Sequence, residues 1–282
     1  MKLKINKFVT SAIREIQAKS ILNPSRLGCD YAINPYNGCA FGCAYCYAIF
    51  MSRMGHQNEN WGEWVDVKIN APEILIHDLQ HKKPGSIFFS SVTDAYQGLE
   101  TKYQLTRKCL EILVNVKYPA PISILTKSPL VTRDIDLFKK LDCEVGMTVT
   151  STGDPITRLI ETHAPPNHLR IKTLKKLHKA GINTYAFVGP LLPHLAEKPK
   201  ELEKLFEALK QAGVSDILIE HINLSPYIKK RLYLFILKNL PQELVKFKMA
   251  EKEEYQERLT RLINQLLAKI KFKSKRIITH ND

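Results

Sequence analysis

The sequence predicts an α/β fold, a partial barrel of six parallel strands connected by helices. Strand-like apolar runs alternate with segments of helical spacing, and no Pro/Gly/Ser-rich linker interrupts them. The composition, 44% hydrophobic and 25% charged, is that of a globular protein. Strands connected by helices require a parallel sheet with right-handed crossovers. Six such units are two short of the full eight-stranded barrel.

The elements follow one another in a regular order. We expect strands at residues 31–35, 86–92, 121–126, 145–149, 182–188 and 216–221, and helices at 102–116, 129–141, 169–179 and 199–211. Gly181 and Gly213 end the last two of these helices. After Pro226 we expect helices only, the last with an apolar stripe from Tyr255 to Ile270. We therefore divide the chain into a core barrel with a short N-terminal segment, residues 1–228, and a basic helical extension packing on it, residues 229–282.

The charge balance is strongly basic. The chain has 42 Lys+Arg against 28 Asp+Glu, a net charge of +14, and residues 229–282 hold 14 Lys+Arg against 6 Asp+Glu, a net +8. This excess fits a polyanionic partner, or else a solvated helical tail of a Lys-rich proteome. No run approaches the ~18 apolar residues that span a bilayer, and the N-terminus lacks a secretory signal. We therefore expect a cytoplasmic protein with no membrane contact.

Three cysteines follow the first predicted strand with the spacing Cys39-x3-Cys43-x2-Cys46. A structural zinc site needs four ligands, and His56, ten residues on, is the only further candidate nearby. An iron–sulfur cluster suits an all-thiolate set, and a 4Fe–4S cluster held by three Cys leaves one iron open to a ligand. We expect Cys109 and Cys143 to lie in the core, and Cys29 is unassigned.

The cysteine loop, with Tyr45 before the third Cys, resembles that of the radical S-adenosylmethionine enzymes. The wider pattern resembles the spore photoproduct lyase-like branch, also called DNA-repair photolyase-like, which includes peptide-modifying spliceases. The phrases that carry this resemblance lie between residues 30 and 227: Asn34-Pro35-Tyr36, Val92-Thr93-Asp94-Ala95-Tyr96-Gln97, Leu125-Thr126-Lys127-Ser128, Ser151 with Asp154, and Gly189-Pro190.

The resemblance implies a partial (β/α)6 barrel with a 4Fe–4S cluster bound by Cys39, Cys43 and Cys46. The open iron of the cluster would chelate the amino and carboxylate groups of S-adenosylmethionine. An electron from an external donor, passed through the cluster, would then break a C–S bond of this cofactor. The resulting 5′-deoxyadenosyl radical would abstract hydrogen from a substrate, while the protein directs the radical and excludes water.

The resemblance also assigns roles to individual residues. The expected contacts are Tyr45 with adenine, Thr93 and Asp94 with the methionine ammonium, Lys127 and Arg158 with its carboxylate, Ser151 with ribose or carboxylate, and Gly189 with adenine. Tyr47 resembles a tyrosine that relays hydrogen. Each residue also has a structural explanation. The alternatives are a loop aromatic at Tyr45, a helix N-cap at Asp94, a turn at Ser151 or Gly189, a surface position for Lys127 or Arg158, and simple packing for Tyr47.

Two macromolecular substrate classes fit these features. The lyase carries a hydrogen-donor cysteine beside the second-strand phrase, where this chain has Ser90-Ser91-Val92, so thymine-dimer reversal is not expected. We favour a ribosomally made precursor peptide, modified as in the spliceases with a small partner protein. The alternative is repair or modification of a nucleic acid, which the charge favours, although aromatic residues do not interleave the basic C-terminal run. A cluster-carrying binding or electron-transfer protein is a third reading, which would not need the polar phrases at the strand ends.

Overall fold

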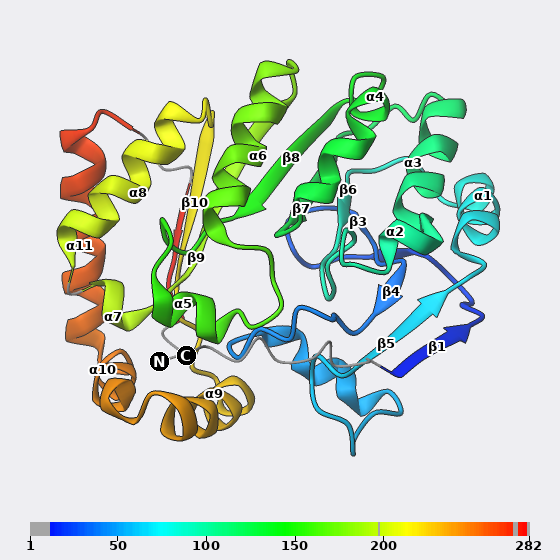
Figure 1. Cartoon of the computed structure of the whole chain (residues 1–282). Helices are drawn as coiled ribbons and strands as arrows, with labels where there is room; N and C mark the ends of the chain where they lie inside the picture. The colour runs from blue at the N-terminus through cyan, green and yellow to red at the C-terminus, as the bar shows by residue number, and fades with distance from the viewer. Residues whose placement is uncertain (1–11, 197, 273–275, 281–282) are drawn as a thin grey trace.

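The computed structural model describes residues 12–196, 198–272 and 276–280, and its centre is a largely parallel sheet (Figure 1). Six strands follow one another across this sheet in chain order, each parallel to the next. They are β3 (Tyr31–Ile33), β6 (Ile87–Phe89), β7 (Ile122–Thr126), β8 (Cys143–Thr148), β9 (Asn183–Leu191) and β10 (Asp216–His221). Each coincides with a predicted strand, so the predicted six-stranded α/β architecture is confirmed.

Two short strands extend this sheet at its edges. β2 (Leu22–Pro24) pairs antiparallel with β3, and β11 (Arg276–Ile278) pairs parallel with β10. The expectation of helices only after Pro226 is therefore wrong at β11. Three residues are too few to show the alternation of a strand, and β11 forms only where β10 offers an unpaired edge.

A second, three-stranded sheet lies behind the cysteine loop and was not predicted. Its order is β1 (Ala12–Ile16), β5 (Trp64–Lys68), β4 (Tyr36–Asn37), with β1 parallel and β4 antiparallel to β5. The first two residues of β5, Trp64 and Val65, are fully buried. Because β4 leads directly into the loop, the cysteines follow a paired and fixed stretch of backbone.

The helices that connect the strands differ in detail from the predicted ones. The predicted helix 102–116 is divided at Gln104, a residue with φ of 53°, and the predicted helix 129–141 begins as a 3-10 helix. The α-helices are α1 (Ala71–His81), α2 (Glu100–Tyr103), α3 (Leu105–Asn115), α4 (Ile135–Phe138), α5 (Pro155–Ile160), α6 (Asn167–Lys179), α7 (Pro193–Ala196), α8 (Pro199–Gln211), α9 (Pro226–Asn239), α10 (Leu244–Met249) and α11 (Glu253–Lys269). The 3-10 helices are η1 (Tyr47–Arg53), η2 (Pro129–Asp134) and η3 (Pro241–Glu243).

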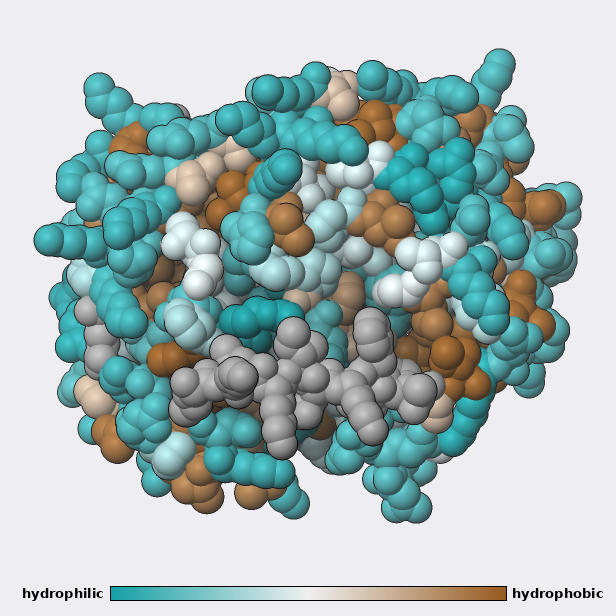
Figure 2. Space-filling model, in the orientation of Figure 1, coloured by the Kyte–Doolittle hydropathy of each residue, from teal (hydrophilic) through white to brown (hydrophobic). Residues whose placement is uncertain are grey.

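The helices cover the sheet on its outer side. In Figure 1, α3, α4, α6 and α8 lie along the sheet, and α11 lies beside α8. The inner stripe of α11 is buried, including Tyr255, Leu259 and Ile263. Hydrophobic residues are scattered among hydrophilic ones over the face shown in Figure 2. Within the described ranges, no helix combines the length and apolarity needed to cross a membrane.

The end of β10 is joined to α11 by a buried histidine. His221 is 2% exposed, and its Nε2 lies 3.1 Å from Oγ1 of Thr260 on α11. Burial, assisted by nearby His280, lowers the pKa of His221 from 6.5 to about 4. The folded protein therefore takes up a proton at His221 only at lower pH than the unfolded chain does.

We predict that this histidine makes stability depend on pH. The free energy of unfolding should fall as the pH drops from about 6.5 to about 4, because the unfolded chain binds the proton more readily. The full effect is about 3 kcal/mol. Urea unfolding across this range should show that His221→Asn lacks this pH dependence, whereas His168→Asn, exposed on α6, keeps it. An equally steep loss in His221→Asn would assign the titration to another group.

Candidate active site

The three cysteines of the loop lie together and are shielded from solvent. Cys39 and Cys43 are buried, and Cys46 is partly buried. Burial raises the pKa of all three thiols, and the charges of Asp94, Cys46 and Cys43 raise that of Cys39 further. Each thiol therefore lies within electrostatic reach of another. In the described parts of the chain, no three His, Cys, Asp or Glu side chains surround a position for a single ion.

Two glycines allow the loop its tight path. Gly38 has φ of +78°, and a Cβ there would lie 2.6 Å from the carbonyl oxygen of Trp64. Gly42 has φ of +59°, and its Cα lies 2.7 Å from where a Cβ on Gly62 would stand. Side chains at these positions would push the loop off β5 and the segment before it.

His56 is not placed to complete a metal site. Its ring stacks on Trp64 with centroids 3.6 Å apart, and both ring nitrogens lie 2.9 Å from carboxylates, Nδ1 from Glu59 and Nε2 from Asp66. Cys109 and Cys143 are buried in the core, as predicted. Cys29 donates to Ser25 Oγ at 3.2 Å. Three soft thiolates with one open position form the donor set that suits a 4Fe–4S cluster.

The segment after β6 fastens the cysteine loop. Thr93 Oγ1 donates to the Gly38 carbonyl at 2.5 Å, and Gln97 Oε1 accepts from the Ala40 amide at 2.8 Å. The sequence drew attention to Thr93 as a cofactor contact, whereas its hydroxyl here holds the loop backbone. Gln97 belongs to the same phrase, but its position in the sequence did not indicate its partner.

Asp94 joins the ends of two neighbouring strands. Its buried carboxylate accepts from Thr126 Oγ1 at 2.6 Å, from the Lys127 amide at 2.8 Å and from the Tyr96 amide at 2.9 Å. Burial raises the pKa of Asp94, while these hydrogen bonds oppose the rise. Asp94 does not cap α2, which begins only at Glu100. Its hydrogen bonds bring Lys127, after β7, toward the cysteine loop.

Lys127 lies over the ring of Tyr45. Its Nζ is 5.7 Å from the ring centroid. Burial alone would lower the pKa of Lys127, but the charges of Cys43 and Glu161 hold it above the usual value. The Tyr45 hydroxyl in turn donates to the Glu161 carboxylate. A cation therefore stands beside the thiols at the carboxyl ends of the strands.

Glu161 also forms a buried ion pair that the sequence analysis missed. Its carboxylate accepts from Arg170 Nη2 at 2.6 Å, and both side chains are almost fully buried. Arg158, by contrast, donates to the carbonyls of Glu161 at 3.0 Å and Ala164 at 2.6 Å. A signal for Arg170 was available, because it shares the buried stripe of α6 with Leu174 and Leu177.

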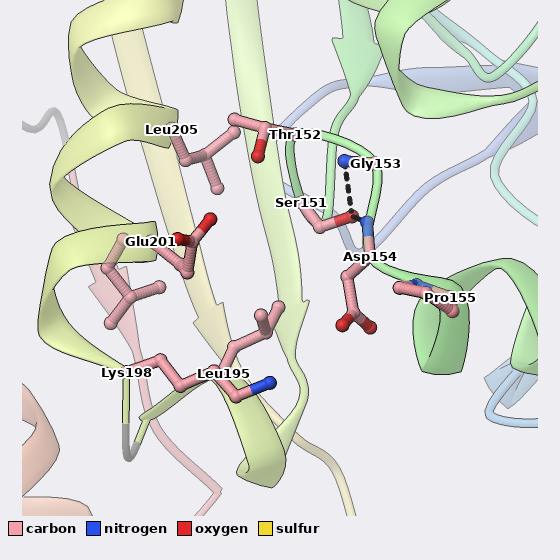
Figure 3. Close-up of a pocket in the computed structure, with 10 residues that line it drawn as sticks. Ser151, Thr152, Gly153, Asp154, Pro155, Leu195, Lys198, Glu201 and Leu205 are labelled. Atoms are coloured by element: carbon pink, nitrogen blue, oxygen red, sulfur yellow. Dashed lines mark hydrogen bonds between the residues drawn. The ribbon is translucent and has the colours of Figure 1, made fainter.

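Ser151 and Asp154 shape the turn after β8. Ser151 Oγ accepts from the amides of Gly153 and Asp154 at 3.3 Å each, and Asn167 donates to it at 3.4 Å. The Asp154 carboxylate caps α5 through the Thr157 amide at 2.8 Å, and it lies 2.6 Å from Nε2 of the buried His194. The turn borders a cavity of about 500 Å³, which is also lined by Glu201 of α8 and by Lys198 just before this helix (Figure 3).

Gly189 lies within β9, near its carboxyl end, and Tyr47 begins η1. Gly189 precedes Pro190 through a cis peptide bond, and a Cβ there would lie 2.4 Å from the Phe187 ring and 2.8 Å from Glu220 Cβ. The Tyr47 hydroxyl donates to the Ser91 carbonyl after β6, while its ring is half exposed. Thr93 and Lys127 thus contact the cysteine loop and Asp94 positions Lys127, whereas Gly189 packs near Phe187 and Glu220.

An arginine from α9 grips the cysteine loop, and the sequence analysis missed it. Arg231 donates to the carbonyls of Cys43 at 2.6 Å, Gly42 at 3.1 Å and Trp61 at 3.3 Å. Burial lowers the pKa of Arg231, while the charges of Cys46 and Cys43 oppose this. The predicted division between residues 228 and 229 falls inside α9, so the helix that carries this arginine crosses it.

The chain matches the sequence pattern of a known enzyme superfamily. The sequence pattern of the Radical SAM superfamily matches residues 33–209, more than half of the chain, and the chain belongs to this superfamily. Membership implies a 4Fe–4S cluster and S-adenosylmethionine as cofactors. The match covers the cysteine loop and strands β4 to β9.

Individual proteins show the same relationship. An uncharacterized protein of Methanocaldococcus jannaschii is 44% identical over 187 residues, which is 66% of this chain and 70% of that protein. Spore photoproduct lyase complexed with dinucleoside spore photoproduct aligns with a TM-score of 0.72 at 15% identity, over 96% of this chain and 83% of that one. A mutant of the lyase with bound S-adenosylmethionine and dinucleoside spore photoproduct aligns with a TM-score of 0.68 at 16% identity, over 96% and 82%. At these identities, the two structures establish the shared fold.

We predict that Arg231 is needed for the loop to retain its metal. Arg231→Met removes the donor to three carbonyls and should destabilise the protein by about 2–4 kcal/mol. Iron retained after anaerobic reconstitution should fall at the same time. Lys238→Met, exposed on the same helix, is the matched control and should change neither quantity. Iron content and stability like those of the wild type in Arg231→Met would show that the loop holds its shape without this contact.

Proposed function

We propose that this radical S-adenosylmethionine enzyme repairs or modifies a nucleic acid. The observation that supports the chemistry is the group of three thiols, two buried and one partly buried, with the Lys127 cation beside them. When bound, the cluster and S-adenosylmethionine supply a 5′-deoxyadenosyl radical that abstracts hydrogen from the substrate. An external electron donor is required, and cytoplasmic localisation stays a prediction.

We assign the cluster to Cys39, Cys43 and Cys46. The positive charges of Lys127 and Arg231 favour the thiolate forms that bind iron. Lys127 also offers a cation to the carboxylate of S-adenosylmethionine, and Tyr45, fixed by Glu161, offers a ring near it. Thr93, Asp94, Ser151, Arg158 and Gly189 would shape the strand ends around this cofactor. Tyr47 stays our candidate for hydrogen relay.

The substrate class rests on charge and on the neighbours. The net charge of +14 favours a polyanion. The two lyase structures compared above are complexes with a dinucleoside spore photoproduct, which supports a nucleic acid over the precursor peptide that we favoured from sequence. Ser90, Ser91 and Val92 stand where a hydrogen-donor cysteine would be expected for dimer reversal, so we propose another lesion or modification.

The cluster assignment predicts that the three loop cysteines act as a set. Replacing Cys39, Cys43 or Cys46 with Ala should abolish most of the brown colour and the roughly four irons per chain expected after anaerobic reconstitution. Cys109→Ala, in the core on α3, is the matched control and should keep both. Iron analysis and visible absorption measure the outcome. A colourless Cys109→Ala together with a brown Cys43→Ala would overturn the assignment.

The nucleic-acid proposal predicts binding that depends steeply on salt. Binding releases counterions from the phosphates, so six or more phosphate contacts would reduce affinity about 10³-fold between 50 and 200 mM salt. Fluorescence anisotropy with labelled DNA and RNA strands measures this slope. Binding that hardly changes with salt, or that is undetectable at the lower salt concentration, would favour the precursor peptide and its partner protein.

A further inference from the structure

Exposed aromatic side chains gather at one place on the described surface. Among the described residues, the aromatic side chains that stand well out of the surface are Tyr47 (48% exposed), Phe50 (41%) and Tyr227 (59%). Tyr47 and Phe50 belong to η1, Tyr227 lies in the first turn of α9, and these two helices are in contact. Residues far apart in the sequence thus contribute to one aromatic surface.

The geometry of η1 aligns these side chains. A 3-10 helix has three residues per turn, so Tyr47, Phe50 and Arg53 lie above one another on one edge. The rings of Tyr47 and Phe50 are 6.4 Å apart between centroids, and the Arg53 guanidinium lies 4.5 Å from the centroid of Tyr227. We call the row formed by Tyr47, Phe50, Arg53 and Tyr227 the aromatic ridge.

One end of the aromatic ridge lies at the candidate active site. Tyr47 follows Cys46 directly, and its hydroxyl donates to the Ser91 carbonyl after β6. Arg53 and the exposed Lys230 supply positive charge near the other end. Burial and the charges of Cys46 and Glu220 raise the pKa of the Tyr47 hydroxyl. The carboxylate of Glu220 lies 3.1 Å from Nε2 of His280.

We propose that the aromatic ridge is a stacking platform for unpaired bases of a nucleic-acid strand that leads to the active site. This inference rests on the proposed function and extends it. Flat aromatic faces with an interleaved guanidinium are what bases stack on, and such stacking tolerates any sequence. A radical formed beside Cys46 can reach only a nucleotide held close to it. An unpaired strand can present such a nucleotide, whereas a duplex hides its bases.

The test separates bases from phosphates. The probes are two labelled single strands of about 16 nucleotides, one of mixed sequence and one built of abasic units with the same phosphates. Wild-type protein with its cluster should bind the strand with bases more tightly. Phe50→Ala and Tyr227→Ala should each weaken that binding about 5- to 100-fold and leave binding of the abasic strand unchanged. Anisotropy at about 100 mM salt measures all six affinities, those of the wild type and of the two variants for each strand.

Conservative variants and a matched control distinguish loss of base stacking from loss of folding. Phe50→Trp and Tyr227→Phe should restore tight binding, and Leu237→Ala, exposed on α9 away from the ridge, should behave as wild type. None of these variants should change the slow release of 5′-deoxyadenosine in the absence of substrate. If Phe50→Ala and Tyr227→Ala bind the strand with bases as tightly as the wild type does, the stacking role of the aromatic ridge is wrong, while the proposed function stands. This surface would then be assigned to a protein partner. If the wild type binds neither strand, the proposed function fails and the ridge fails with it.

Discussion

The carboxylate of Glu161 is the buried negative charge around which the candidate active site is arranged. It forms an ion pair with Arg170 and accepts a hydrogen bond from the Tyr45 hydroxyl, and its charge raises the pKa of Lys127. Removing one partner of a buried ion pair costs about 3–5 kcal/mol, because the other charge is left uncompensated. Here the loss would reach further, because Tyr45 precedes Cys46 and its ring lies under Lys127. The geometry beside the thiols therefore depends on this anion.

The polar residues near the strand ends form hydrogen bonds with one another and with the cysteine loop. Thr93 holds the cysteine loop, Asp94 holds the backbone of Lys127, and Asn167 reaches both Ser151 and Glu161. Such connections fix the loops before any cofactor binds. A cofactor then meets groups that are already oriented, which lowers the entropic cost of binding.

Much of the fold could be predicted because its signals are local. The apolar runs of β7 and β9 and the stripe of α8 lie within single stretches of sequence, as does the spacing of Cys39, Cys43 and Cys46. The contacts that the sequence did not reveal are long-range. Arg231 meets Cys43 across 188 residues, and the pairing of β1 with β5 depends on two segments about fifty residues apart meeting in space. Arg170 is an intermediate case. An arginine in a buried helical stripe indicates that a buried partner exists, but the sequence does not show which residue that partner is.

The hydrogen bonds from Arg231 to the cysteine loop also have a consequence for the order in which the chain is synthesised and loaded with iron. A ribosome releases the N-terminal part of a chain first, and the loop emerges 188 residues before the arginine that braces it. Until Arg231 has emerged, the nascent chain therefore carries three thiols without this support. We therefore expect iron and sulfur to be delivered to this chain after α9 has emerged and docked, when the cysteine loop already has its support.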